Sequence, residues 1–260
     1  MRDSAVLGGL LALTIVFSLV WGKVLWYFDE RSQGFRRLVL FAMGFTRRKP
    51  GEVRALLLSL IYYGVGLLAT GILGGIFRVP VTAMISWAPA HLAHTVLGII
   101  GAISLSNLFV DLGCRLAGQG RPDQFAEVKE VPWIKGLREF PALVVPVVAA
   151  LGGVVEEIFF RGVLLHVLTN KLLVNPLVAV AISGTLFCLQ QLVQVRTAFQ
   201  AMIIGSGCAA ISIVGGLLVV TTGSVVAAVL CHASFVIFFM TQGSKAAASS
   251  NPCQTEVAAR

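Results

Sequence analysis

The sequence predicts an all-α fold, a polytopic membrane protein with about seven transmembrane helices. Of its 260 residues, 57% are hydrophobic and only 12% are charged, whereas a soluble domain has about 25% charged residues. Its apolar runs also reach the roughly 20 residues that a helix needs to cross a bilayer. A chain with so little charge cannot cover a water-facing surface, so soluble, disordered and collagen-like classes are excluded.

The expected spans are bounded by charged loops, prolines and polar turns. Pro89 is expected to kink or split the third span. The first span is too long for a signal-peptide core and no small-x-small cleavage site follows it, so it is expected to be retained. A short amphipathic helix is expected around 35–45, and a surface helix before Pro141. The seven spans cover 5–28, 55–77, 81–110, 142–168, 174–193, 199–220 and 225–240.

Three regions follow from this pattern. Residues 1–140 contain the first transmembrane helices and the basic loops between them. Residues 141–240 form a helical core in which unusual polar side chains occur. Residues 241–260 form an Ala/Ser-rich tail that is expected to be disordered.

The net charge of +8 comes from Lys and Arg in loops between apolar segments. Segments 29–54 and 111–139, the turn at Arg196 and the tail hold 15 of the 20 basic residues. Cytoplasmic loops are enriched in Lys and Arg, so the amino terminus is expected outside and the carboxyl terminus in the cytoplasm. The expected location is an integral membrane position, in the plasma or inner membrane if the source is bacterial. This bias accounts for the basic residues without a nucleic-acid partner.

Three charged residues lie within the apolar span 142–168. They are Glu156, Glu157 and Arg161, and each charge at a helix centre costs about 2.5–3.5 kcal/mol. Arg161 lies four positions after Glu157, about 40° away around a helix, so the two can form an ion pair. Glu156 points roughly 140° from Arg161 and could take a proton from water. The alternative is an ion-pair network that only fixes helix packing.

Later spans add further polar groups, Gln190 and Gln191 in the fifth and His232 in the seventh. For a lone intramembrane histidine the simpler interpretation is an interhelical hydrogen bond. The five cysteines are scattered and form no CxxC pair, which argues against disulfides and structural zinc. His91 and His94 lie near Pro89 and are expected at the interface or in packing. No metal and no cofactor are expected.

Three segments together resemble the CPBP family of intramembrane proteases, which includes the CAAX prenyl proteases and bacterial Abi-type proteins. Glu156-Glu157-Ile-Phe-Phe-Arg161 matches the family's EExxxR motif. Phe187-Cys-Leu-Gln-Gln191 resembles its FxxxH segment. Thr222-Gly-Ser and His232-Ala233 resemble its last motif, TGS…HAxxN. The resemblance covers about 141–239.

The resemblance implies a role for each matched residue. Glu156 would be the general base, His232 an oxyanion donor, and Glu157 with Arg161 would orient the site. Two positions depart from the family pattern. Gln191 replaces the FxxxH histidine and cannot accept a proton at neutral pH. Val236 replaces the asparagine and offers no donor, and losing one such donor typically costs about 2.7–4 kcal/mol.

Three functions are therefore compared. The first is an intramembrane endopeptidase that uses a Glu156-activated water on a membrane protein or a lipid-anchored peptide. The second is a catalytically impaired member of the family that binds and regulates a partner or confers self-immunity. The third is a transporter or proton-coupled channel, because buried carboxylates also serve proton relays. The absence of an internal repeat disfavours the third.

Overall fold

The computed structural model describes residues 2–118, 120 and 124–249. Across this part of the chain the protein is helical, without a β-strand. The α-helices are α1 (Arg2–Trp26), α2 (Gln33–Thr46), α3 (Pro50–Phe77), α4 (Ala90–Leu116), α5 (Gln124–Lys129), α6 (Pro132–Leu137), α7 (Val145–Glu157), α8 (Pro176–Leu192), α9 (Ala198–Thr222) and α10 (Val225–Ser249).

Within the described residues, four helices are long and apolar enough to cross a membrane, namely α1, α3, α4 and α9. Two shorter apolar helices accompany them, α8 and the Val225–Met240 part of α10. The α7 helix continues through two π-helical segments, Ile158–Leu164 and Val167–Lys171, so its helical path covers all but the first three residues of the predicted span 142–168. The predicted all-α membrane fold is confirmed, and the number of spans agrees approximately.

The third segment is split, as expected at Pro89, because a 3₁₀ turn (Val81–Met84) is followed by an irregular stretch and α4 starts directly after Pro89. Two predicted boundaries differ from the structure. The helix α4 extends beyond Asp111 to Leu116, because a charged residue marks the end of the apolar stretch and not of the hydrogen-bonded helix. The last helix continues beyond Met240 to Ser249, where the sequence predicts a tail. Residues 250–260 of that tail lie outside the described residues.

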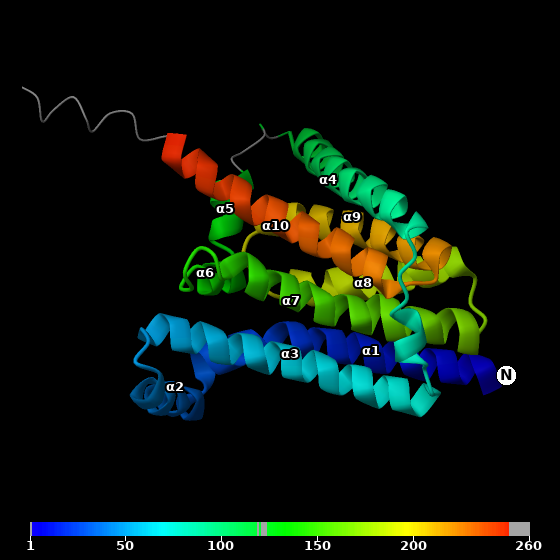
Figure 1. Ribbon diagram of the computed structural model, residues 1–260, viewed down its shortest axis with the longest axis horizontal. Helices are drawn as coiled ribbons and strands as arrows, with labels where there is room; N and C mark the ends of the chain where they lie inside the picture. Colours follow the sequence, from blue (N-terminus) through cyan, green and yellow to red (C-terminus); the bar gives the residue numbers. More distant parts are fainter. Residues whose placement is uncertain (1, 119, 121–123, 250–260) are drawn as a thin grey trace, which may run out of the picture.

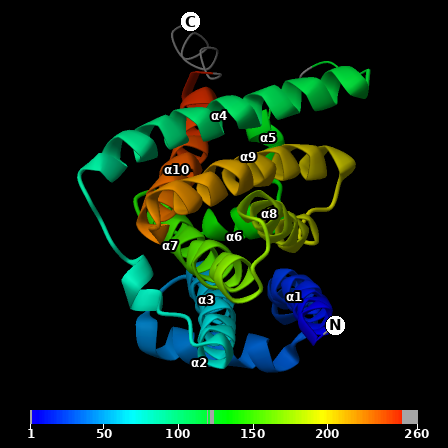
Figure 2. The ribbon, with the colours of Figure 1, turned by 90° about the vertical axis from the view of Figure 1, so that its right-hand side faces the viewer.

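The helices are stacked around α7 and α8 (Figures 1 and 2). Seen along the bundle, α1 and α3 lie on one side, and α9, α10 and then α4 lie on the other. In the middle, α7 packs against α3 and α10, while α8 packs against α1 and α9. The two helices that contain most of the predicted polar site residues are therefore the most central in the bundle.

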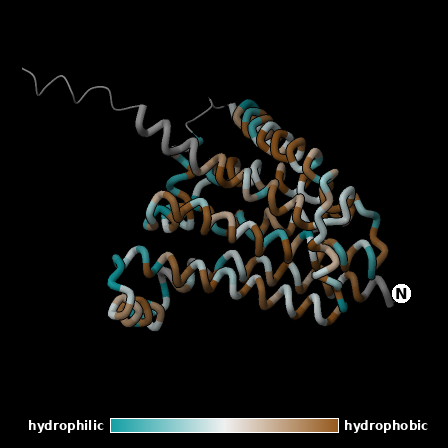
Figure 3. The backbone as a smooth tube through the Cα atoms, viewed as in Figure 1, coloured by the Kyte–Doolittle hydropathy of each residue, from teal (hydrophilic) through white to brown (hydrophobic). Residues whose placement is uncertain are grey.

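The helix α2 confirms the predicted amphipathic segment. Its first turn is capped by Ser32, whose hydroxyl oxygen accepts a hydrogen bond from the Phe35 amide at 3.1 Å. Phe35 and Val39 are buried against the start of α3, whereas Arg37 on the opposite side is exposed. The predicted surface helix before Pro141 is present as α5 and α6. Figure 1 places α2, α5 and α6 at the same end of the bundle, and Figure 3 shows hydrophilic residues there.

Close contact between α8 and α9 depends on glycine. A methyl group placed on Gly184 would lie 2.7 Å from the Cβ of Ser212. Such a separation is too short for two carbon atoms, so any larger residue would push the helices apart. The contact matters for the site, because Ser212 is held by the Gly184 carbonyl and in turn contacts Arg161.

Candidate active site

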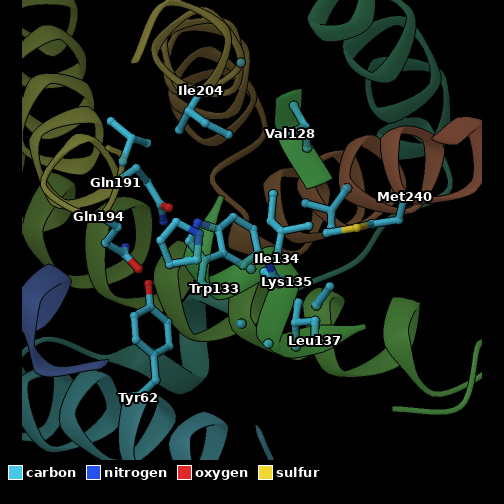
Figure 4. Close-up of a pocket in the computed structure, with 18 of the residues that line it drawn as sticks. Tyr62, Val128, Trp133, Ile134, Lys135, Leu137, Gln191, Gln194, Ile204 and Met240 are labelled. Atoms are coloured by element: carbon cyan, nitrogen blue, oxygen red, sulfur yellow. The ribbon is translucent and has the colours of Figure 1, made fainter. Parts of the chain in front are cut away.

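A cavity of about 730 Å³ opens between the central helices, a volume within the range of ligand-binding pockets. Its walls come from α3, α7, α8, α9 and α10, and α5 with α6 flank one side. Figure 4 shows Tyr62 of α3 entering the pocket with its hydroxyl toward the side where Gln191 of α8 and Gln194, just after α8, lie. Trp133 and Ile134 of α6 line the pocket as well. The predicted site residues that line it are Glu156, Gln191 and His232.

Glu156 lies at the end of α7 and is 5% exposed. Its Oε1 atom accepts two hydrogen bonds, one from the Tyr62 hydroxyl and one from Gln191 Nε2 at 2.6 Å. These donors hold the carboxylate in one orientation. Its other oxygen, Oε2, faces α10 and lies 3.9 Å from His232 Nε2. Two of the predicted residues, Gln191 and His232, therefore flank Glu156 on opposite sides.

Glu157 and Arg161 form the predicted ion pair, with 3.1 Å between Oε1 and Nη1. Both side chains are almost completely buried, at 0% and 1% exposure. The guanidinium also donates to Ser212 Oγ at 3.2 Å and lies over the Phe187 ring, 4.5 Å from its centre. Buried charges need such surroundings, because an unpaired charge in the interior is very costly. The pair is thus anchored in α8 and α9 as well as in its own helix.

His232 connects the two glutamates. Its Nδ1 lies 2.9 Å from Glu157 Oε1, and because a carboxylate can only accept, Nδ1 is assigned the proton. The Nε2 atom then faces Glu156, and in the neutral ring it is an acceptor. Gly153 of α7 lies directly against the imidazole, and a methyl group at this position would be 3.4 Å from the ring.

Two site residues, Tyr62 and Trp21, are missing from the set predicted from the sequence. Tyr62 is hydrogen-bonded to Glu156 and also accepts a hydrogen bond from Gln190 Nε2. Trp21 of α1 donates from Nε1 to the Tyr62 carbonyl at 3.1 Å. A signal for Tyr62 exists in the sequence, because transmembrane tyrosines favour the two membrane interfaces. Tyr62 instead lies near the middle of the 28-residue helix α3.

Two further positions from the sequence analysis, Val236 and His94, lie in different parts of the structure. Val236, which replaces the family's asparagine, follows His232 by one turn of α10 and lines the same cavity. His94 lies away from it and contacts the Ala90 carbonyl within α4, at 3.1 Å between Nδ1 and the oxygen. Within the described residues, no three His, Cys, Asp or Glu side chains are arranged to hold a metal ion.

Comparison with known families agrees with the resemblance predicted from the motifs. The family model for the Rce1-like type II CAAX prenyl endopeptidases matches residues 138–238. No curated protein and no solved structure gives a significant match. The predicted resemblance is therefore confirmed over the region that contains Glu156, Glu157, Arg161, Gln191 and His232. Tyr62 and Trp21 lie outside it.

Proposed function

We propose that this integral membrane protein, whose residues 138–238 match a family of type II CAAX prenyl endopeptidases, hydrolyses a peptide bond inside its central cavity. The substrate is a membrane protein segment or a lipid-anchored peptide. One observation supports the proposal above all: Glu156 Oε1 is held by two donors while Oε2 faces His232 across 3.9 Å. A carboxylate fixed in this way is suited to act as a general base.

The reaction follows from the contacts of the site. Glu156 takes a proton from a water molecule, and the water oxygen attacks the carbonyl carbon of the substrate. The carbon–nitrogen bond then breaks, and the proton passes from Glu156 to the leaving nitrogen. Glu157, held by Arg161 at 3.1 Å, fixes His232 at 2.9 Å. Gln191 holds the base through its amide and does not need to accept a proton.

Cleavage by the purified protein tests this function. We expect the wild-type chain in liposomes to cut a prenylated peptide, giving two products whose new termini are identified by mass spectrometry. The new carboxyl group should incorporate one oxygen atom from ¹⁸O-labelled water, because water is the nucleophile. Absence of cleavage over a panel of prenylated and transmembrane peptides would contradict the proposal and favour the impaired, partner-binding alternative that Gln191 and Val236 suggest.

We also propose that the end of the bundle formed by α2, α5 and α6 faces the cytoplasm. The segments 29–54 and 111–139 at this end contain most of the basic residues, and such loops stay on the cytoplasmic side. The amino terminus is then outside. A fluorescent reporter that folds only in the cytoplasm should be active when fused after the last residue and inactive when fused before the first, and the opposite result would reverse the orientation.

A further inference from the structure

The proposed hydrolysis needs a hydrogen-bond donor for the negatively charged oxygen of the tetrahedral intermediate. In enzymes of this kind such donors supply a large part of the rate enhancement. His232 is poorly suited while it is neutral, because its Nδ1 proton is directed to Glu157 at 2.9 Å and its Nε2 atom is then an acceptor. Val236, one turn later on the cavity wall, has no donor.

We infer that Tyr62 is a further catalytic residue of the proposed hydrolysis and that its hydroxyl donates to the oxyanion. The hydroxyl contacts the reacting carboxylate directly, through Glu156 Oε1. The ring belongs to α3, which lies outside the matched region 138–238. An N-terminal helix thus contributes to a site otherwise built from the last helices.

The surroundings of Tyr62 favour this role. Gln190 Nε2 donates to the phenol oxygen, while the phenol's own proton is donated to Glu156 Oε1. Cooperative hydrogen bonding of this kind strengthens the hydroxyl as a donor. The Trp21 indole fixes the Tyr62 carbonyl at 3.1 Å. Trp21 itself is fully buried, and its ring lies tilted against the Tyr62 ring with 5.1 Å between ring centres. Glu156 and Gln190 therefore hold the hydroxyl itself, and Trp21 holds the backbone and ring of Tyr62.

The movement of charge during the reaction explains how the Tyr62 hydroxyl can donate to Glu156 at rest and to the oxyanion of the intermediate. At rest, Glu156 bears the negative charge and attracts the Tyr62 proton. When Glu156 takes the proton from water it becomes neutral, and the negative charge moves to the substrate oxygen. Hydrogen bonds to ionised acceptors are about twice as strong as neutral ones, so the Tyr62 O–H turns toward the oxyanion. It returns when the intermediate collapses and Glu156 loses its proton.

The test compares Tyr62→Phe with Tyr63→Phe in the full-length protein in liposomes. The matched control is the neighbouring Tyr63, whose hydroxyl donates to the Val148 carbonyl and not to a site residue. We expect Tyr62→Phe to lower kcat by about 100- to 1,000-fold, the effect of losing one oxyanion donor, with KM nearly unchanged. Tyr63→Phe should keep wild-type kcat.

A second substitution distinguishes a role of Tyr62 as a hydrogen-bond donor from a purely structural role. Val236→Asn places an amide on the cavity wall one turn from His232, and it should recover at least about tenfold of the lost kcat in the Tyr62→Phe background. Normal kcat in Tyr62→Phe, or a loss that Val236→Asn does not relieve, would overturn the role of Tyr62. The inference rests on the proposed function. An inactive wild-type protein would reject that function first, whereas an active wild type with an equally active Tyr62→Phe would reject only this inference.

Discussion

Glu156→Gln should lower kcat for peptide cleavage by about 10²- to 10⁴-fold, the usual contribution of a general base. The fold should tolerate the change, because glutamine has the same shape. Its carbonyl oxygen can accept from Tyr62 and Gln191, as Glu156 Oε1 does. Its amide nitrogen then faces His232 Nε2, which accepts in the neutral ring. The substitution removes the base while leaving each neighbour with a partner.

The measurement is kcat at saturating peptide in liposomes, with the amount of folded protein determined by size-exclusion chromatography. Glu52→Gln is the matched control, because this carboxylate lies in the first turn of α3 and pairs with Arg48 at 3.4 Å, outside the cavity. It should cleave at the wild-type rate. Cleavage by Glu156→Gln at a rate close to that of Glu52→Gln would reject Glu156 as the base, even with the endopeptidase activity itself established.

Local relationships within one helix could be predicted from the sequence. The ion pair between Glu157 and Arg161 follows from a separation of four residues, and it is present although π-helical turns begin at Ile158. The split at Pro89 follows from the missing amide of proline. The start and end of each apolar run predicted the bounds of most helices to within a few residues. The exceptions include the ends of α4, which continues past Asp111, and α10, which continues past Met240.

The part of the site that depends on helix packing could not be predicted. Tyr62 is 94 positions before Glu156, and only the packing of α3 against α7 brings the two side chains together. The same is true of Ser212, which reaches Arg161 because Gly184 lets α9 approach α8. Motif spacing records neighbours along the chain, whereas these contacts depend on which helix faces lie opposite each other. A tyrosine at the middle of a span was the one available signal.

Arg161→Met should destabilise the protein strongly. The substitution keeps an unbranched side chain of similar length but leaves Glu157 as a buried charge without its cation, since both groups are at most 1% exposed. Breaking a buried ion pair in this way costs about 3–5 kcal/mol. For a chain of this size the apparent melting temperature in detergent should fall by about 6–20 °C. The surface pair gives the control, because Arg48 is 57% exposed and Arg48→Met should cost at most about 1 kcal/mol.

A double substitution distinguishes the cost of leaving the Glu157 charge unpaired from the cost of losing the packing of Arg161. Glu157→Gln combined with Arg161→Met removes both charges and keeps an oxygen that can accept from His232 Nδ1. Replacing a whole buried pair by neutral groups is often nearly neutral, so the double variant should melt well above Arg161→Met alone. If it melts as low as the single variant, the Arg161 contacts with Ser212 and Phe187, rather than its charge on Glu157, hold α7, α8 and α9 together. If Arg161→Met melts like Arg48→Met, the buried ion pair contributes nothing to the fold.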